Sequence, residues 1–172
     1  ARLKDKKGLN YGNKKITVST SGIANKIAEA ANEIGTYLAL SLHAPNDKLR
    51  EKIMPINQKF PIKNLIKELK YYTSVVKEPI FLEYVMLKGI NDSQDCAKQL
   101  VQLMSQFPSK VNLIEFNSWP GVKFEPTERK DIEKFSKFIQ DKGYMSFIRR
   151  SRGDDVLAAC GQLRTESERI KI

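Results

Sequence analysis

Apolar residues along the chain follow two spacings, one typical of buried strands and one typical of amphipathic helices. Short runs rich in β-branched and other apolar residues predict strands over residues 16–20, 37–43, 80–87, 111–117 and 144–150. Between these runs, apolar residues recur every three or four positions, which predicts helices within 23–34, 61–72, 95–107 and 131–142. Gly35 and Gly143 directly follow two of these helical stretches and are typical helix stops.

Strands that alternate with helices of this length predict βαβ units and a parallel sheet, so we expect an α/β fold. No low-complexity segment or linker divides the chain, and we expect residues 1–172 to form a single domain. The longest irregular stretch, residues 117–127, lies between the fourth strand and the helix that follows it. Connecting loops of this length in compact domains are often functional.

Polar side chains gather where the predicted strands end. Ser19 lies at the end of the first strand, Ser41 and His43 at the end of the second, and Asn117 at the end of the fourth. The carboxyl ends of parallel strands meet at one edge of the sheet, which is where ligands bind in such folds. Each of these residues singly also suits helix capping or a turn, but the repetition over successive strands favours a ligand-binding edge.

The charge balance favours a polyanionic partner. The chain has 30 Lys and Arg residues against 20 Asp and Glu, a formal net charge of +10. An excess of this size suits nucleic acid through phosphate neutralisation, although a solvated basic surface is the alternative explanation. Two cysteines are too few for a secreted disulfide framework, so we expect a reducing cytoplasm. No apolar run is long enough to span a membrane, and we expect no membrane association.

Several familiar chemistries lack support in the sequence. His43 is the single histidine, which excludes a site built from several histidines, and we expect no metal site within this chain. Neither a Walker motif nor a dinucleotide glycine pattern is present. Glu83 sits mid-strand, where it suits a barrel-lining carboxylate or an internal hydrogen-bond anchor equally well. By helical spacing alone, both Cys96 and Cys160 are expected to be small buried hydrophobes.

Five strings together resemble one protein family. "VSTSGI", "LALSLHAPNDKLREKIMPIN", "LEYVMLKGIND", "VNLIEFN" and "RGDDVLAACGQL" occur in this order over residues 18–163. The combination resembles the radical S-adenosylmethionine RNA methyltransferases, which methylate C2 of an adenine in 23S ribosomal RNA and, in bacteria, in transfer RNA. A related family that methylates C8 of such an adenine is an open alternative. A non-catalytic basic RNA-binding module is another.

The resemblance implies roles for particular residues. It implies that Ser19, Ser41, Leu42, His43 and Asn117 contact S-adenosylmethionine. It also implies that Cys160 is the catalytic residue, which one S-adenosylmethionine first methylates. A radical made from a second S-adenosylmethionine at a [4Fe–4S] cluster then takes a hydrogen from this methyl group, and the carbon radical adds to the base. A second cysteine resolves the adduct, and a reductase supplies electrons to the cluster.

The sequence also departs from this family. The three closely spaced cysteines that hold the cluster are missing, as are the resolving cysteine and the N-terminal RNA-binding domain. We therefore expect a fragment, the C-terminal two-thirds of a partial (βα)6 barrel with parallel strands and outer helices. We expect this fragment alone to be inactive. The full-length protein is expected to be a cytoplasmic monomer that acts on 23S rRNA and tRNA.

Overall fold

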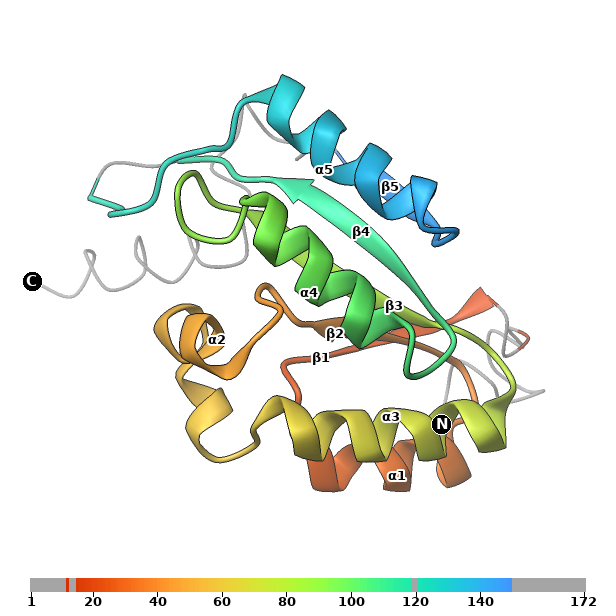
Figure 1. The fold of residues 1–172 in the computed structure, drawn as a ribbon. Helices are drawn as coiled ribbons and strands as arrows, with labels where there is room; N and C mark the ends of the chain where they lie inside the picture. Colours follow the sequence, from red (N-terminus) through yellow and green to blue (C-terminus); the bar gives the residue numbers. More distant parts are fainter. Residues whose placement is uncertain (1–11, 13–14, 119–120, 150–172) are drawn as a thin grey trace, which may run out of the picture.

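The computed structural model describes residues 12, 15–118 and 121–149, and its strands and helices alternate along the chain (Figure 1). The strands are β1 (Thr17–Thr20), β2 (Tyr37–Ser41), β3 (Ile80–Met86), β4 (Ser109–Glu115) and β5 (Ser146–Arg149). The helices are α1 (Ala24–Glu33), α2 (Asp47–Ile53), α3 (Ile62–Val76), α4 (Gln94–Met104) and α5 (Arg129–Asp141), with a 3₁₀ helix, η2, at Pro55–Gln58.

The five strands form one sheet in the order β1-β2-β3-β4-β5, and every neighbouring pair is parallel. This confirms the predicted α/β fold with a parallel sheet. When consecutive parallel strands are also neighbours, right-handed crossovers place all connecting helices on the same face. In Figure 1, α1, α3, α4 and α5 accordingly cover one side of the strands.

The core lies between the sheet and this helical layer. Along β3, buried and half-buried side chains alternate, and Ile80, Leu82, Tyr84 and Met86 face the helices. The helices contribute their apolar stripes, with residues such as Ile27, Leu65, Leu100 and Ile132 in the same cluster. Cys96 is 5% exposed within this core, which confirms its structural role. The opposite face of the sheet, which corresponds to the inside of a barrel, carries more polar side chains.

The segment after β2 contains helices that the apolar spacing did not predict. Asn46 caps α2, because its Oδ1 accepts the Leu49 N–H over 3.0 Å. Asp47 lies in the first turn of α2, where the helix dipole favours a carboxylate. Together, α2 and the following 3₁₀ helix η2 hold polar residues against the ends of β1 and β2. No helix in the described ranges is long and apolar enough to cross a bilayer.

Candidate functional site

Polar residues meet across the open face of the sheet, near its carboxyl edge. Ser41 lies opposite Glu83, and Glu83 lies opposite Asn112, so side chains from three strands share one row. The Asn112 side chain donates to Glu83 Oε1 over 2.7 Å. Glu83 is thus an internal hydrogen-bond anchor, one of the two roles that its position allowed. The Asn112 Oδ1 atom is buried and has no hydrogen-bond partner among the described residues.

His43 completes the edge of the sheet beyond the end of β2. It has a left-handed backbone, with φ of 57°, and its imidazole Nδ1 accepts the Val85 N–H over 3.1 Å. Strand β2 ends at Ser41, so Val85 has no partner in that strand. The side chain therefore supplies the acceptor that the strand no longer offers to a backbone N–H.

Burial fixes the protonation state of His43, and its hydrogen bond fixes the tautomer. Burial, and secondarily the nearby Arg50 guanidinium, lower the pKa of His43 from 6.5 to about 4. The ring is therefore neutral near pH 7. Since Nδ1 accepts a hydrogen bond, the proton of the neutral ring resides on Nε2. His43 thus offers an N–H donor at its Nε2 atom.

Arg50 ties the carboxyl ends of β1 and β2 together. Its side chain is fully buried, and its guanidinium donates to the carbonyl oxygens of Ser21, Ser41 and Leu42 over 2.8, 3.1 and 3.2 Å. A fourth bond, 2.9 Å long, runs to Asn57 Oδ1 in η2. Burial lowers the pKa of Arg50, which nevertheless keeps its charge at neutral pH. This one side chain therefore sets the relative positions of two strand ends and η2.

Gly22 permits the close approach of Arg50 to the turn after β1. Its φ is +97°, and a Cβ atom at this position would lie 2.9 Å from Arg50 Nη2. A side chain here would therefore meet both backbone strain and a steric clash. The glycine of the "STSG" stretch is explained by this packing.

Asn91 holds His43 from the other side. Its Nδ2 donates to the carbonyl oxygens of His43 and Val85, each over 2.7 Å. Its Oδ1 accepts the Leu87 N–H over 2.8 Å, and its carbonyl accepts the Tyr84 hydroxyl over 2.7 Å. Asn91 is fully buried, so each of these bonds satisfies a group that water does not reach. The turn after β3 is thereby fixed to the end of β2.

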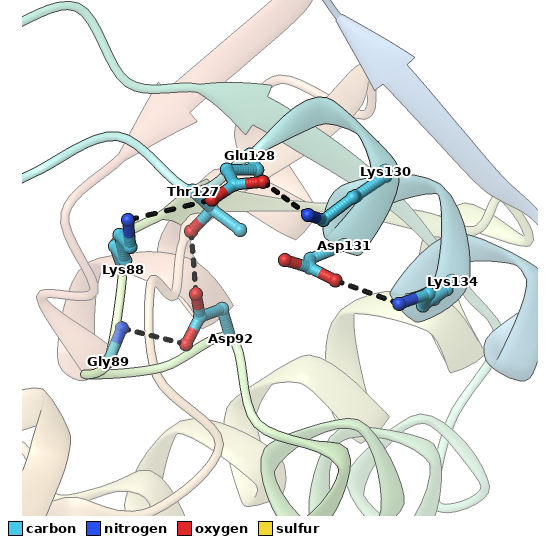
Figure 2. Close-up of polar contacts among 8 residues, drawn as sticks. All are labelled: Lys88, Gly89, Asp92, Thr127, Glu128, Lys130, Asp131 and Lys134. Atoms are coloured by element: carbon cyan, nitrogen blue, oxygen red, sulfur yellow. Dashed lines mark hydrogen bonds and ion pairs between the residues drawn. The ribbon is translucent and has the colours of Figure 1, made fainter.

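A second group of contacts holds the segment that precedes α5. Figure 2 shows Asp92 between the Gly89 N–H and the Thr127 hydroxyl, and both distances are 3.0 Å. Glu128 lies between Lys88 and Lys130, at 3.7 and 2.7 Å, and these two cations lower its pKa, Lys130 most strongly. The segment just before α5 is therefore attached to the turn after β3.

The predicted cofactor residues lie on or just beyond β1, β2 and β4, and the side chain of Leu42 differs from the others in its chemistry. Ser19 is exposed on β1, Ser41 ends β2, and Asn117 lies half-buried two residues beyond β4. Strands β2 and β4 flank β3, which separates their ends by about 10 Å. Leu42 differs, because its side chain is buried in the core and its N–H and C=O bond to Glu83 and Arg50. Cys160, the predicted catalytic residue, lies outside the described residues.

Sequence reasoning missed Arg50, which organises this edge, whereas Asn91 was expected only as one of the polar residues where the third strand ends. Arg50 and Asn91 together bond to backbone groups at the ends of β1, β2 and β3. Both lie within the strings that carried the family resemblance, which was the available signal.

Among the described residues, no three His, Cys, Asp or Glu side chains come together as a metal site.

Comparisons with solved structures define the class of protein. A radical SAM methyltransferase from Sphaerobacter thermophilus matches with a TM-score of 0.88 and 38% identity, over 93% of this chain and 47% of that one. A domain of the pyruvate-formate lyase-activating enzyme from Bacteroides vulgatus matches with a TM-score of 0.61 at 14% identity, which concerns the fold alone. The fold is that of a radical SAM methyltransferase, as the sequence motifs predicted.

Comparisons of sequence identify the relatives more narrowly. The dual-specificity RNA methyltransferase RlmN of Rhodopseudomonas palustris strain HaA2 is 46% identical over 169 residues, which cover 98% of this chain and 42% of the relative. RlmN of Agrobacterium fabrum is 49% identical over 168 residues, which cover 97% of this chain and 41% of the relative. No protein-family model matches. The chain is homologous, along nearly its whole length, to a part of the RlmN proteins, and it spans less than half of their length.

Proposed function

We propose that this chain is the S-adenosylmethionine-binding part of a radical S-adenosylmethionine RNA methyltransferase. The observation that carries the proposal is the edge organised by His43, Arg50 and Asn91, whose residues lie in strings shared with that family. The homology to proteins named dual-specificity RNA methyltransferases supports the same conclusion. The substrate that we propose is C2 of an adenine in 23S rRNA and tRNA, modified in the cytoplasm by a monomeric protein that an electron-donating reductase serves.

The donor set at the edge suits S-adenosylmethionine. The ligand presents hydroxyl, carboxylate and purine groups, which hydrogen-bond to hydroxyls, amides and N–H donors. Ser19, Ser41 and Asn117 offer such groups, and His43 offers its Nε2–H. Leu42 contributes by its buried side chain and bonded backbone, which hold the edge in place. When bound, S-adenosylmethionine supplies both the methyl group and the precursor of the radical.

The residues of this chain do not fit an iron–sulfur cluster. Such a cluster takes at least three cysteine thiolates, and the chain has two cysteines in all. Cys96 is buried on α4, within the apolar core. We therefore propose that the cluster ligands come from outside this chain, and that the chain alone does not turn over. Cys160 remains our candidate for the methyl carrier.

The experiment compares two cysteine variants in the complete protein that carries this segment. Cys160→Ala should abolish methylated adenine in RNA digests, a loss of about 1,000-fold or more, because the thiol accepts the transferred methyl group. Cys96→Ala is the matched control and should keep the activity within a fewfold of wild type. Liquid chromatography with mass spectrometry against 2-methyladenosine and 8-methyladenosine standards measures the product.

Each other outcome has a defined meaning. Undiminished product in Cys160→Ala would refute the role of that thiol, and an 8-methyl product would refute the C2 assignment. The second candidate function, a basic RNA-binding module, is favoured by the net charge of +10. Salt-dependent RNA binding by this chain, without binding of S-adenosylmethionine in calorimetry, would replace the enzymatic proposal with that module.

A further inference from the structure

A groove of about 790 Å³ runs between α3 and α4 on the outside of the sheet. Its floor is apolar, made by Ile62, Ile66 and Leu103, and one end reaches Asn46 and Asp47. Asn46 Nδ2 donates to Gln99 Oε1 over 2.7 Å and so links that end of the groove to α4. Since Asn46 follows His43 by three residues, the groove opens beside the carboxyl edge of the sheet.

Two rows of nitrogen-bearing side chains border this groove. Lysines occur on α3 at spacings of four and three residues, and glutamines occur along α4 and just beyond it at spacings of three and four. Residues at these spacings share one helical face, so each row follows the groove for about 10 Å. All six side chains belong to exposed residues: Lys63, Lys67, Lys70, Gln99, Gln102 and Gln106.

The three lysines have no carboxylate partner among the residues that the structure describes. Each cation of α4 and α5 has a carboxylate partner, as in Lys134–Asp131 at 3.1 Å and Lys137–Asp141 at 3.2 Å. In contrast, none of the three α3 lysines forms an ion pair with a described residue. Asp47 is the single acid among the described residues that border the groove, and its Oδ1 accepts from the Asn57 side chain and the Ile62 N–H, each over 2.8 Å.

A neighbouring groove has the opposite charge pattern. It measures about 600 Å³, lies between α4 and α5, and is bordered by Asp92, Asp131 and Asp141 together with Lys134 and Lys137. Both of these lysines are ion-paired within the groove wall. Two grooves of similar size on one helical layer therefore differ in whether their cations are free to meet an external anion.

We propose that the groove between α3 and α4 is a docking surface for the phosphate backbone of the RNA substrate. Unpaired ammonium groups along a line suit successive phosphates, and amide N–H groups opposite them suit phosphate or ribose oxygens. The groove ends beside the candidate site, so an RNA strand seated there leads to the edge that holds His43. The inference rests on the proposed function for the identity of the polyanion, and it assigns a separate surface to it.

The test measures RNA affinity of the complete protein as a function of salt. In the triple variant Lys63→Gln, Lys67→Gln, Lys70→Gln, the slope of log affinity against log salt should fall by about 2. The dissociation constant at low salt should rise by about tenfold or more. The matched control is Lys130→Gln, Lys134→Gln, Lys137→Gln, which removes the same formal charge from ion-paired positions and should change the slope by less than about 1.

A photocrosslinker at Gln102 identifies the occupant directly, and we expect it to capture RNA. Equal slopes in the two triple variants, while the wild type binds and methylates RNA, would overturn the docking surface and leave the proposed function intact. Crosslinking to another protein segment instead of RNA would overturn it in the same way. Absence of RNA binding by the wild-type complete protein would overturn both proposals, so the two failures are distinguishable.

Discussion

The His43 imidazole occupies the position of a strand carbonyl, because its Nδ1 accepts the Val85 N–H beyond the last residue of β2. The backbone carbonyl of His43 accepts from the Asn91 side chain, and the backbone N–H of His43 donates to the Glu83 carbonyl. The left-handed backbone turns the side chain back toward β3, where a longer β2 would have continued. At this position a titratable ring is therefore part of the sheet, and its protonation affects the fold as well as any ligand.

This arrangement predicts a pH dependence of stability. The folded-state pKa of His43 is about 4, below the value of 6.5 in the unfolded chain, so protonation between these values favours unfolding. Stability should be complete above about pH 6.5 and should fall as the pH decreases toward 4, by up to about 3 kcal/mol. Urea denaturation of this chain between about pH 7 and about pH 4.5 measures the effect.

The control for this prediction is His43→Gln, whose amide oxygen accepts the same N–H but does not titrate. The variant should be less stable near pH 7 and should lose much of the pH dependence in this range, because His43 is the single histidine of the chain. Identical slopes in wild type and variant would show that His43 does not control stability here.

Among the elements, α2 and η2 act as a clamp on the ends of β1 and β2. Arg50 from α2 reaches three backbone carbonyls, and Asn57 from η2 joins Arg50 to Asp47. Neither helix is long enough to be stable by its own apolar stripe, since α2 has seven residues and η2 has four. Their stability comes from the buried polar contacts that they make with the sheet.

Substitution of Arg50 by Lys tests this clamp. An ammonium group keeps the charge but cannot reach four acceptors in fixed planar directions, so buried carbonyls lose their donors. We expect a loss of about 2–4 kcal/mol in the free energy of unfolding. The exposed pair at Arg129 provides the control, because Arg129→Lys should cost less than about 1 kcal/mol. Equal effects in guanidinium denaturation would contradict the clamp.

The fold was predictable where apolar spacing controls it. The buried side of β3 and the stripes of α3 and α5 follow simple periods, and the strands lie within two residues of the predicted positions. The α2–η2 segment was not predictable in this way, because it is held by Arg50 rather than by an apolar face. Strands β2 and β4 were both predicted to end two residues too late. His43 has a left-handed backbone that turns the chain out of the sheet, and Asn117 lies beyond the end of β4.

The candidate site was predictable in part. Strand ends indicated Ser41 and His43, because parallel strands bring their carboxyl ends to one edge. The partners of His43 depend on contacts between residues more than 40 positions apart in the chain, such as Asn91 with His43. A single sequence does not report such pairs. The resemblance supplied the role of Cys160, which local periodicity never indicated, and that role stays a prediction.

In the whole molecule, the described sheet is open at both sides. Strand β1 pairs with β2 and β5 pairs with β4, and no other described strand borders either of these two. On the polar face of the sheet, Phe147 of β5 is 46% exposed, whereas Asn112 beside it on β4 is buried. The homologous RlmN proteins are more than twice as long as this chain. Under the proposed function, the cluster ligands that this chain lacks are therefore expected from additional polypeptide.

Anaerobic reconstitution of this chain with iron and sulfide tests that expectation. Two cysteines, one of them buried on α4, cannot provide three thiolates, so no stoichiometric [4Fe–4S] absorbance or paramagnetic signal should form. The complete protein, treated in parallel, is the positive control and should give both signals. A stoichiometric cluster on the isolated chain would refute the proposal that its ligands lie elsewhere.

The bonds around His43 have a consequence for the energetics of ligand capture. Arg50 and Asn91 already fix the backbone of the β2 end, so this part of the edge is in place before a ligand arrives. Association then loses little conformational entropy on the protein side, and each new hydrogen bond contributes more fully to affinity. The edge is preorganised, and a small ligand that binds there should find a rigid receptor rather than induce one.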